Sequence, residues 1–171
     1  MKIELKKLSL DDNIDIYQLL QSLPKDENGF QNSANSLSQI EFKQWLAKNV
    51  DIENGINLED WMVPQIIYWL YIDEVPVGKG KLRTRLTDSL KIDGGHCGYS
   101  ICPQYRNKGY GKLLLKLMTK EAAKLGIDRI LLTINNDNMA SIKVAINSGG
   151  TIEKVVDNRH YIWIECINNG A

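Results

Sequence analysis

The sequence has no excess charge of either sign and no long apolar run, and these absences exclude several classes of protein. Lys plus Arg and Asp plus Glu both number 21 among 171 residues, so the formal net charge is zero. Proteins that bind nucleic acid or anionic membranes usually carry a basic excess. The longest apolar stretches, such as 66–72, are far shorter than the roughly 20 residues of a membrane-spanning helix. Residues 1–4 also lack the apolar block of a signal peptide. We expect a cytoplasmic protein with no nucleic-acid or membrane partner.

Cysteine is also scarce. The chain holds Cys97, Cys102 and Cys166, an odd number in a sequence too long to be a small disulfide scaffold. We therefore expect reduced thiols. Cys97 and Cys102 lie near His96, but no second ligand pair follows at a zinc-binding spacing, so we expect no metal.

The remaining composition is that of an ordinary globular protein, with 43% hydrophobic and 25% charged residues. The length suits one domain, and no linker, internal repeat or low-complexity tract divides the chain. We predict a single domain over residues 1–171.

Apolar periodicity predicts an α/β protein with a mixed sheet. Ser9 and Asp12 are expected to cap the first helix. The predicted helices are 11–22, 37–48, 109–125 and 139–147. The predicted strands are 3–8, 65–72, 75–86, 95–101, 129–134, 152–156 and 160–167. Residues 25–36, 49–64 and 87–93 are expected to be loops.

Residues 102–112 form the motif that carries the chemistry. The segment Cys-Pro-Gln-Tyr-Arg-Asn-Lys-Gly-Tyr-Gly-Lys joins a predicted strand to a predicted helix. Unpaired backbone N–H groups at a helix N-terminus attract anions, and glycine lets a phosphate approach closely. Arg106, Lys108 and Lys112 gather in the same segment of a neutral chain. This favours a site for a diphosphate or polyphosphate over the simpler alternative, a plain turn.

Two common phosphate motifs do not fit this segment. A Walker loop needs Ser or Thr after Gly-Lys, but Leu113 follows Gly111-Lys112. A dinucleotide fingerprint needs a third glycine where the chain has Leu114.

The segment Arg106-Asn-Lys-Gly-Tyr-Gly111 resembles the Arg/Gln-x-x-Gly-x-Gly/Ala signature of the GNAT superfamily of acetyl-coenzyme-A-dependent N-acetyltransferases. Asn138-Met-Ala-Ser-Ile and Gly149-Gly150 follow in the family's order, and the resemblance extends over nearly the whole chain. It implies a mixed, mostly antiparallel sheet of about seven strands flanked by helices. It also implies transfer of an acetyl group from acetyl-CoA to a primary amine of a small molecule or peptide, by direct attack within a ternary complex.

The resemblance further implies which residues contact the cofactor. A backbone N–H near Ile101 or Cys102 would stabilise the oxyanion, and Ser141 would contact the pantetheine arm unless it only caps its helix. The implied cofactor-binding residues are Ile101, Cys102, Arg106, Asn107, Lys108, Gly109, Tyr110, Gly111, Lys112, Asn138 and Ser141.

The implied catalytic groups fit less well. The tyrosine that commonly acts as acid in the family falls at Ala145, which cannot donate a proton. His96 is the candidate base because its ordinary pKa suits proton removal from an ammonium, with a packed strand histidine as the alternative. Tyr99 and Tyr105 are interpreted as packing residues, and an acyl-cysteine on Cys97 or Cys102 is not favoured.

Acidic residues in the segments that, by resemblance, wall the acceptor site could attract a cationic amine, or could simply be exposed. They are Asp26, Glu27, Asp51, Glu53, Glu59 and Asp60, and Glu27 is the candidate substrate residue. Two other functions stay open: a non-catalytic acyl-CoA-binding module and an unrelated phosphate-binding protein. Homodimer formation also stays open.

Overall fold

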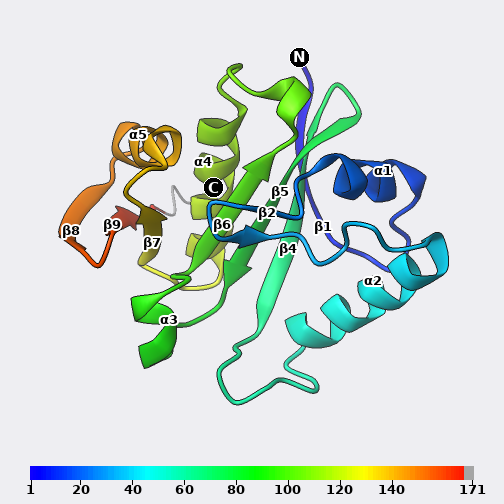
Figure 1. Cartoon of the computed structure of the whole chain (residues 1–171), viewed down its shortest axis with the longest axis horizontal. Helices are drawn as coiled ribbons and strands as arrows, with labels where there is room; N and C mark the ends of the chain where they lie inside the picture. Colours follow the sequence, from blue (N-terminus) through cyan, green and yellow to red (C-terminus); the bar gives the residue numbers. More distant parts are fainter. Residues whose placement is uncertain (168–171) are drawn as a thin grey trace.

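The computed structural model describes residues 1–167, and at its centre lies a four-stranded antiparallel ladder (Figure 1). The strands run in the order β1-β4-β5-β6. Their bounds are β1 Ile3–Lys7, β4 Gln65–Ile72, β5 Val75–Arg83 and β6 Cys97–Ile101. Alternation along β4 places Tyr68 and Leu70 in one core cluster and Ile67 and Trp69 in another. The strand is therefore buried on both faces.

A second, three-stranded ladder continues the sheet in the order β7-β9-β8. Its strands are β7 Arg129–Asn135, β8 Thr151–Val156 and β9 Arg159–Glu165, and all their pairings are antiparallel. The two ladders together supply the seven strands expected, and the predicted mixed, mostly antiparallel architecture flanked by helices is confirmed.

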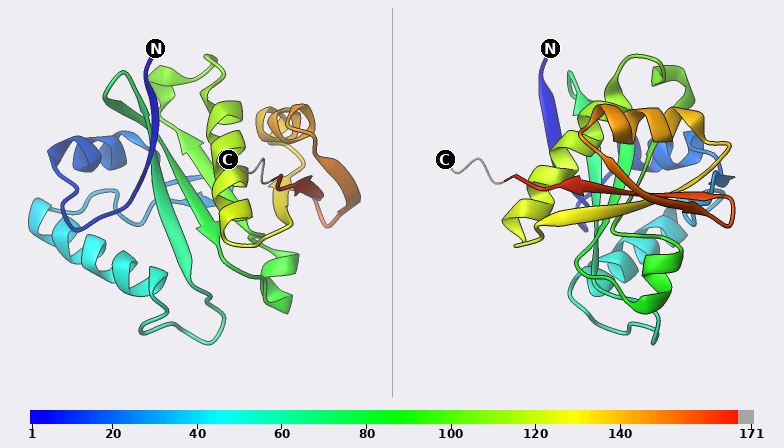
Figure 2. Two further views of the ribbon diagram at one scale, coloured as in Figure 1. Left: turned by 180° about the vertical axis from the view of Figure 1, so that it is seen from behind. Right: turned by 90° about the vertical axis from the view of Figure 1, so that its left-hand side faces the viewer.

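Helices cover both faces of the sheet (Figure 2). Helix α4 (Tyr110–Lys124) packs Leu114 and Met118 against strands of both ladders, and α5 (Met139–Asn147) lies beside it. Helices α1 (Ile14–Ser22) and α2 (Gln39–Glu53) cover the opposite face of the central ladder. Within residues 1–167, no helix combines the length and apolar character needed to cross a membrane.

The two ladders touch where β6 and β7 begin and are not paired along their length. The backbone N–H of His96 donates to the Leu131 carbonyl oxygen at 2.8 Å. Gly95, just before it, has φ +59°, and a β-carbon there would collide with the same carbonyl, so this junction requires glycine. Because β6 and β7 are not neighbours in either ladder, the sheet is split between them.

Several element boundaries differ from those predicted. Helix α1 begins at Ile14 with Asn13 as its cap, because Ser9 and Asp12 instead close a turn on each other, with Ser9 N–H donating to Asp12 Oδ2 at 3.0 Å. Helix α2 runs to Glu53, past the predicted end at residue 48, because buried Ile52 continues its apolar face. Strand β5 ends at Arg83, earlier than predicted.

Two predicted loops contain regular structure. Within 25–36, β2 (Asp26–Glu27) and β3 (Phe30–Gln31) form a hairpin around Asn28 and Gly29, both at positive φ. Asn-Gly is a strong hairpin signal that the sequence analysis did not use. Within 87–93, Thr87 caps the short helix α3 (Asp88–Ile92).

Candidate active site

The loop between β6 and α4 presents a row of unpaired backbone donors. After the 3₁₀ turn Pro103–Tyr105, Asn107 and Gly109 adopt positive φ, and Gly109 begins α4 without a side-chain cap. Within residues 1–167, none of the N–H groups of residues 107–112 donates a hydrogen bond to the protein. An uncapped helix start with free N–H groups carries partial positive charge and suits a phosphate.

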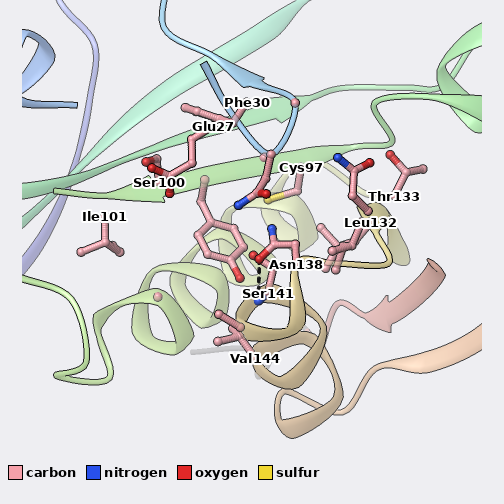
Figure 3. A pocket seen from close by; sticks show the side chains of 18 of the residues that line it. Glu27, Phe30, Cys97, Ser100, Ile101, Leu132, Thr133, Asn138, Ser141 and Val144 are labelled. Carbon is pink, nitrogen blue, oxygen red and sulfur yellow. Dashed lines mark hydrogen bonds between the residues drawn. The ribbon is translucent and has the colours of Figure 1, made fainter. Parts of the chain in front are cut away.

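These donors border a cavity of about 1020 Å³. Its walls come from β5, β6, β7, the start of α4, α5 and the β2–β3 hairpin. Figure 3 shows Glu27 and Phe30 on one side and Asn138, Ser141 and Val144 on the other. The predicted site residues that line the cavity are Glu27, Ile101, Arg106, Asn107, Gly109, Tyr110, Gly111, Lys112, Asn138 and Ser141. Cys102, Lys108 and His96 do not line it.

Arg106 is held by the protein's own groups. Its Nε donates to the Ile101 carbonyl oxygen at 3.0 Å, and its Nη2 lies 2.8 Å from Glu27 Oε1. The side chain therefore ties the β2–β3 hairpin to the end of β6 and the start of the β6–α4 loop, and its charge is already paired. Lys108 lies over the Tyr105 ring, so Lys112 is the cation of the predicted cluster that faces the cavity without a salt bridge within residues 1–167.

Cys102 cannot supply the predicted oxyanion donor. Its N–H donates to the Val77 carbonyl oxygen at 2.9 Å, and the residue is buried in the cluster beneath α1 and α2. Burial raises the pKa of the Cys97 thiol to about 12 and also raises that of Cys102. Because a protonated thiol is a poor nucleophile, neither cysteine is suited to form an acyl-cysteine intermediate.

The structure does not bring His96 to the cavity. Its Nδ1 accepts a hydrogen bond of 2.9 Å from the Leu131 N–H, and its ring lies against Trp163. Burial, with a smaller contribution from the Arg83 charge, lowers the pKa of His96 to about 4. The hypothesis that His96 is the base is not supported, because its imidazole lies outside the cavity and accepts a hydrogen bond from Leu131 of the other ladder.

This histidine predicts a pH-dependent stability. Since its folded pKa of about 4 lies below the ordinary 6.5, the unfolded state binds more protons between these values, and stability falls as pH drops through that window. We expect a loss of about 2–3 kcal/mol from pH 7 to pH 4 from this group. Urea unfolding should show a shallower pH dependence in His96→Asn, whose amide oxygen can replace Nδ1 as acceptor. An unchanged slope in this variant would contradict the assignment.

Helix α5 contributes Asn138 and Ser141 to the cavity. Asn138 Oδ1 accepts from the Ser141 N–H at 3.3 Å and so caps the helix, as Figure 3 shows. Ser141 lines the cavity as well. Ala145, one turn later, is fully buried, so no side chain from this position of α5 reaches the cavity as an acid.

Tyr99 packs against the core cluster, as expected, but it also borders the cavity, which the sequence did not indicate. It lines the cavity from β6, with its ring 3.5 Å from the position of a β-carbon at Gly111. Its hydroxyl is buried and has no hydrogen-bond partner within residues 1–167. Burial raises the pKa of Tyr99 to about 12, and the nearby Ser141 hydroxyl opposes this rise without meeting the geometry of a hydrogen bond. The phenol therefore stays protonated near neutral pH.

Strand β5 supplies a second group that was missed. Lys81 and Arg83 line the cavity, and Lys79 is buried beside them on the same face of the strand. Their two-residue spacing was the available signal, because alternate residues of a strand share a face.

The comparisons with known proteins agree with this arrangement. Residues 31–146, more than half of the chain, match the acetyltransferase (GNAT) family. The chain belongs to the GNAT acetyltransferase family. No curated protein sequence matches it significantly.

Solved GNAT structures share its fold. The ribosomal L7/L12 α-N-protein acetyltransferase RimL in complex with coenzyme A superimposes with a TM-score of 0.73 at 16% identity, covering 99% of this chain and 97% of that one. The N-acetyltransferase PseH from Campylobacter jejuni in complex with acetyl-CoA gives 0.63 at 16% identity, with 96% and 99% covered. The GNAT domain of PAT from S. lividans gives 0.66 at 14% identity, with 95% and 90% covered.

Proposed function

We propose that this GNAT protein transfers the acetyl group of acetyl-CoA directly to a primary amine of a small molecule or peptide. The observation that carries the proposal is the row of free N–H groups at residues 107–112, placed at the rim of the cavity between the split strands. Acetyl-CoA would supply an activated thioester and a diphosphate, and the residues present suit both parts.

The phosphate end is assigned to the loop and α4. The N–H groups of residues 107–112 would bind the diphosphate, with Lys112 adding a charge. Asn138 and Ser141 line the space between α5 and β6 where the pantetheine arm would lie. Holding both reactants in one cavity would supply much of the rate acceleration through proximity.

Proton transfer is assigned to Tyr99. Its hydroxyl is buried without a hydrogen-bond partner within residues 1–167 and stays protonated, so it would donate to the departing thiolate. Among the described residues that line the cavity, the two carboxylates, Glu27 and Asp93, are paired with Arg106 and Arg159. No carboxylate is placed to act as base, so the amine would enter neutral or lose its proton to water.

The test follows release of free coenzyme A thiol when the pure protein is mixed with acetyl-CoA and a panel of amines. We expect amine-dependent release, with intersecting double-reciprocal plots because both substrates bind before reaction. Parallel plots would contradict direct attack. Tight coenzyme A binding without turnover on any amine would instead favour a non-catalytic binding module, for which buried Ala145 is the supporting observation.

A further inference from the structure

A group of three cations lies on the face of β5 opposite α4. Gly78 and Gly80 turn toward α4, since β-carbons at these positions would meet Leu114 and Met118. Alternation therefore places Lys79, Lys81 and Arg83 on the other face, which the β2–β3 hairpin and α2 cover. Phe30 of the hairpin lies near both ammonium groups, 5.4 Å from Lys79 Nζ and 5.7 Å from Lys81 Nζ to the ring centroid.

The two lysines lack anionic partners, whereas burial lowers the pKa of Arg83 and the charge of Asp93, itself paired with Arg159, partly opposes this lowering. Within residues 1–167, the ammonium groups of Lys79 and Lys81 form no salt bridge and donate no hydrogen bond, although Lys79 is only 3% exposed. Arg83 Nη1 donates hydrogen bonds to the carbonyl oxygens of Gly94 and Gly95, at 3.2 and 3.1 Å. Burying unpaired charge is costly unless a ligand completes the site.

The unfavourable burial of charge is reflected in the lowered pKa values of the two lysines. Burial, with a contribution from the neighbouring Arg83 charge, lowers the pKa of Lys81 to about 8. Burial and the charge of Lys81 lower the pKa of Lys79 to about 7. An anion beside these ammonium groups would relieve both effects.

This group is distinct from the cofactor's phosphate site. Lys81 pairs in register with Gly98 near the start of β6, whereas the phosphate loop follows the end of that strand, roughly 10 Å further along. Lys81 and Arg83 also emerge on the sheet face that carries the hairpin, while Lys112 belongs to α4 on the other face. The free N–H groups and Lys112 already account for a diphosphate, which leaves the β5 cations for a second ligand.

We propose that the acceptor amine carries a carboxylate or phosphate group, which Lys81 and Arg83 bind inside the cavity; this rests on the proposed acetyltransferase function. Phe30, whose ring packs directly over Gly98, would border the acceptor's carbon skeleton. The proposed anionic group reverses the expectation of a cationic amine drawn to acidic loops, because Glu27 is paired with Arg106 and the other five acidic residues do not line the cavity.

The test compares amines that differ in one anionic group. Glycine, β-alanine and aspartate are assayed against glycinamide, β-alaninamide and asparagine, and phosphoethanolamine against ethanolamine. We expect kcat/KM to be at least about tenfold higher for the anionic member of the productive pair. The carboxylate and phosphate pairs show which oxyacid is preferred.

Lys81→Met removes the charge and keeps the apolar stem, and should abolish this preference, while Lys81→Arg should retain part of it. Lys6→Met is the matched control, because Lys6 of β1 also lies over an aromatic ring, that of Tyr71 on β4, and is outside the cavity. Coenzyme A affinity should stay unchanged in all three variants. Turnover without charge preference, or a preference that survives Lys81→Met, would overturn the proposal.

A second measurement does not depend on turnover. Acetate and inorganic phosphate are titrated into the protein saturated with coenzyme A, and tryptophan fluorescence reports on Trp45, which lies 5.3 Å from Lys79 Nζ. A saturable response that Lys81→Met removes supports the anion site, and its absence in the wild-type protein overturns it. Failure to bind coenzyme A at all would instead overturn the proposed function, and the two failures are thereby distinguished.

Discussion

Replacing Gly109 by valine is expected to weaken coenzyme A binding at least tenfold, or by about 1.4 kcal/mol, while the protein remains folded. Gly109 has φ +81° and begins α4, and a valine there favours a different backbone conformation. The rearrangement would turn the neighbouring N–H groups away from a common phosphate. Isothermal titration with coenzyme A measures the change.

Gly126 provides a matched control for this variant. It has φ +78°, and a β-carbon there meets nothing within 4 Å, as at Gly109, but it follows the other end of α4, outside the cavity. Gly126→Val should lose a similar free energy of unfolding, about 1–3 kcal/mol, without changing coenzyme A affinity. Equal affinities in both variants would show that the loop does not bind the cofactor as proposed.

Replacing Tyr99 by phenylalanine is expected to lower kcat by about 10- to 100-fold. This lies at the low end of general acid catalysis because a thiolate leaves readily even without assistance. The ring still fills its place beside Gly111, so coenzyme A affinity should be unchanged. Steady-state kinetics with the best amine of the panel, together with titration of coenzyme A, separates the two effects.

Tyr71→Phe is the control for the loss of a tyrosine hydroxyl from a half-buried ring. Tyr71 lies on β4 outside the cavity, and burial likewise raises the pKa of its hydroxyl. This substitution should leave kcat unaltered. If Tyr99→Phe retains full activity, water rather than the phenol protonates the leaving group.

The central strands and long helices could be predicted because their signals are local. The alternating, β-branched residues of β4 and the Lys-rich, amphipathic α4 lie where the periodicity placed them. The hairpin at Asn28-Gly29 was also predictable in principle. The turn at Ser9–Asp12 was mistaken for a cap because Ser and Asp support both structures.

The proposed phosphate-binding loop could be predicted from the sequence alone, because its free N–H groups depend on neighbours in the chain. A strand end, two glycines and a helix start lie within residues 101–112, and these suffice to leave the N–H groups of 107–112 without partners in the described protein. The absence of a tyrosine acid at Ala145 could likewise be predicted from its position in the helix that follows Asn138. In the structure, Ala145 is fully buried.

Only the tertiary structure decided which charges are free. The pairing of Arg106 with Glu27 joins residues 79 positions apart. Because each charge neutralises the other, neither is free for the predicted role, phosphate binding by Arg106 or attraction of an amine by Glu27. His96 faces Leu131 because the two ladders meet there, which strand alternation could not decide. Lys81 lies beside Phe30 because the β2–β3 hairpin folds over β5. Electrostatic interactions act through space, so the character of the acceptor site became apparent only once the hairpin and the sheet were in contact.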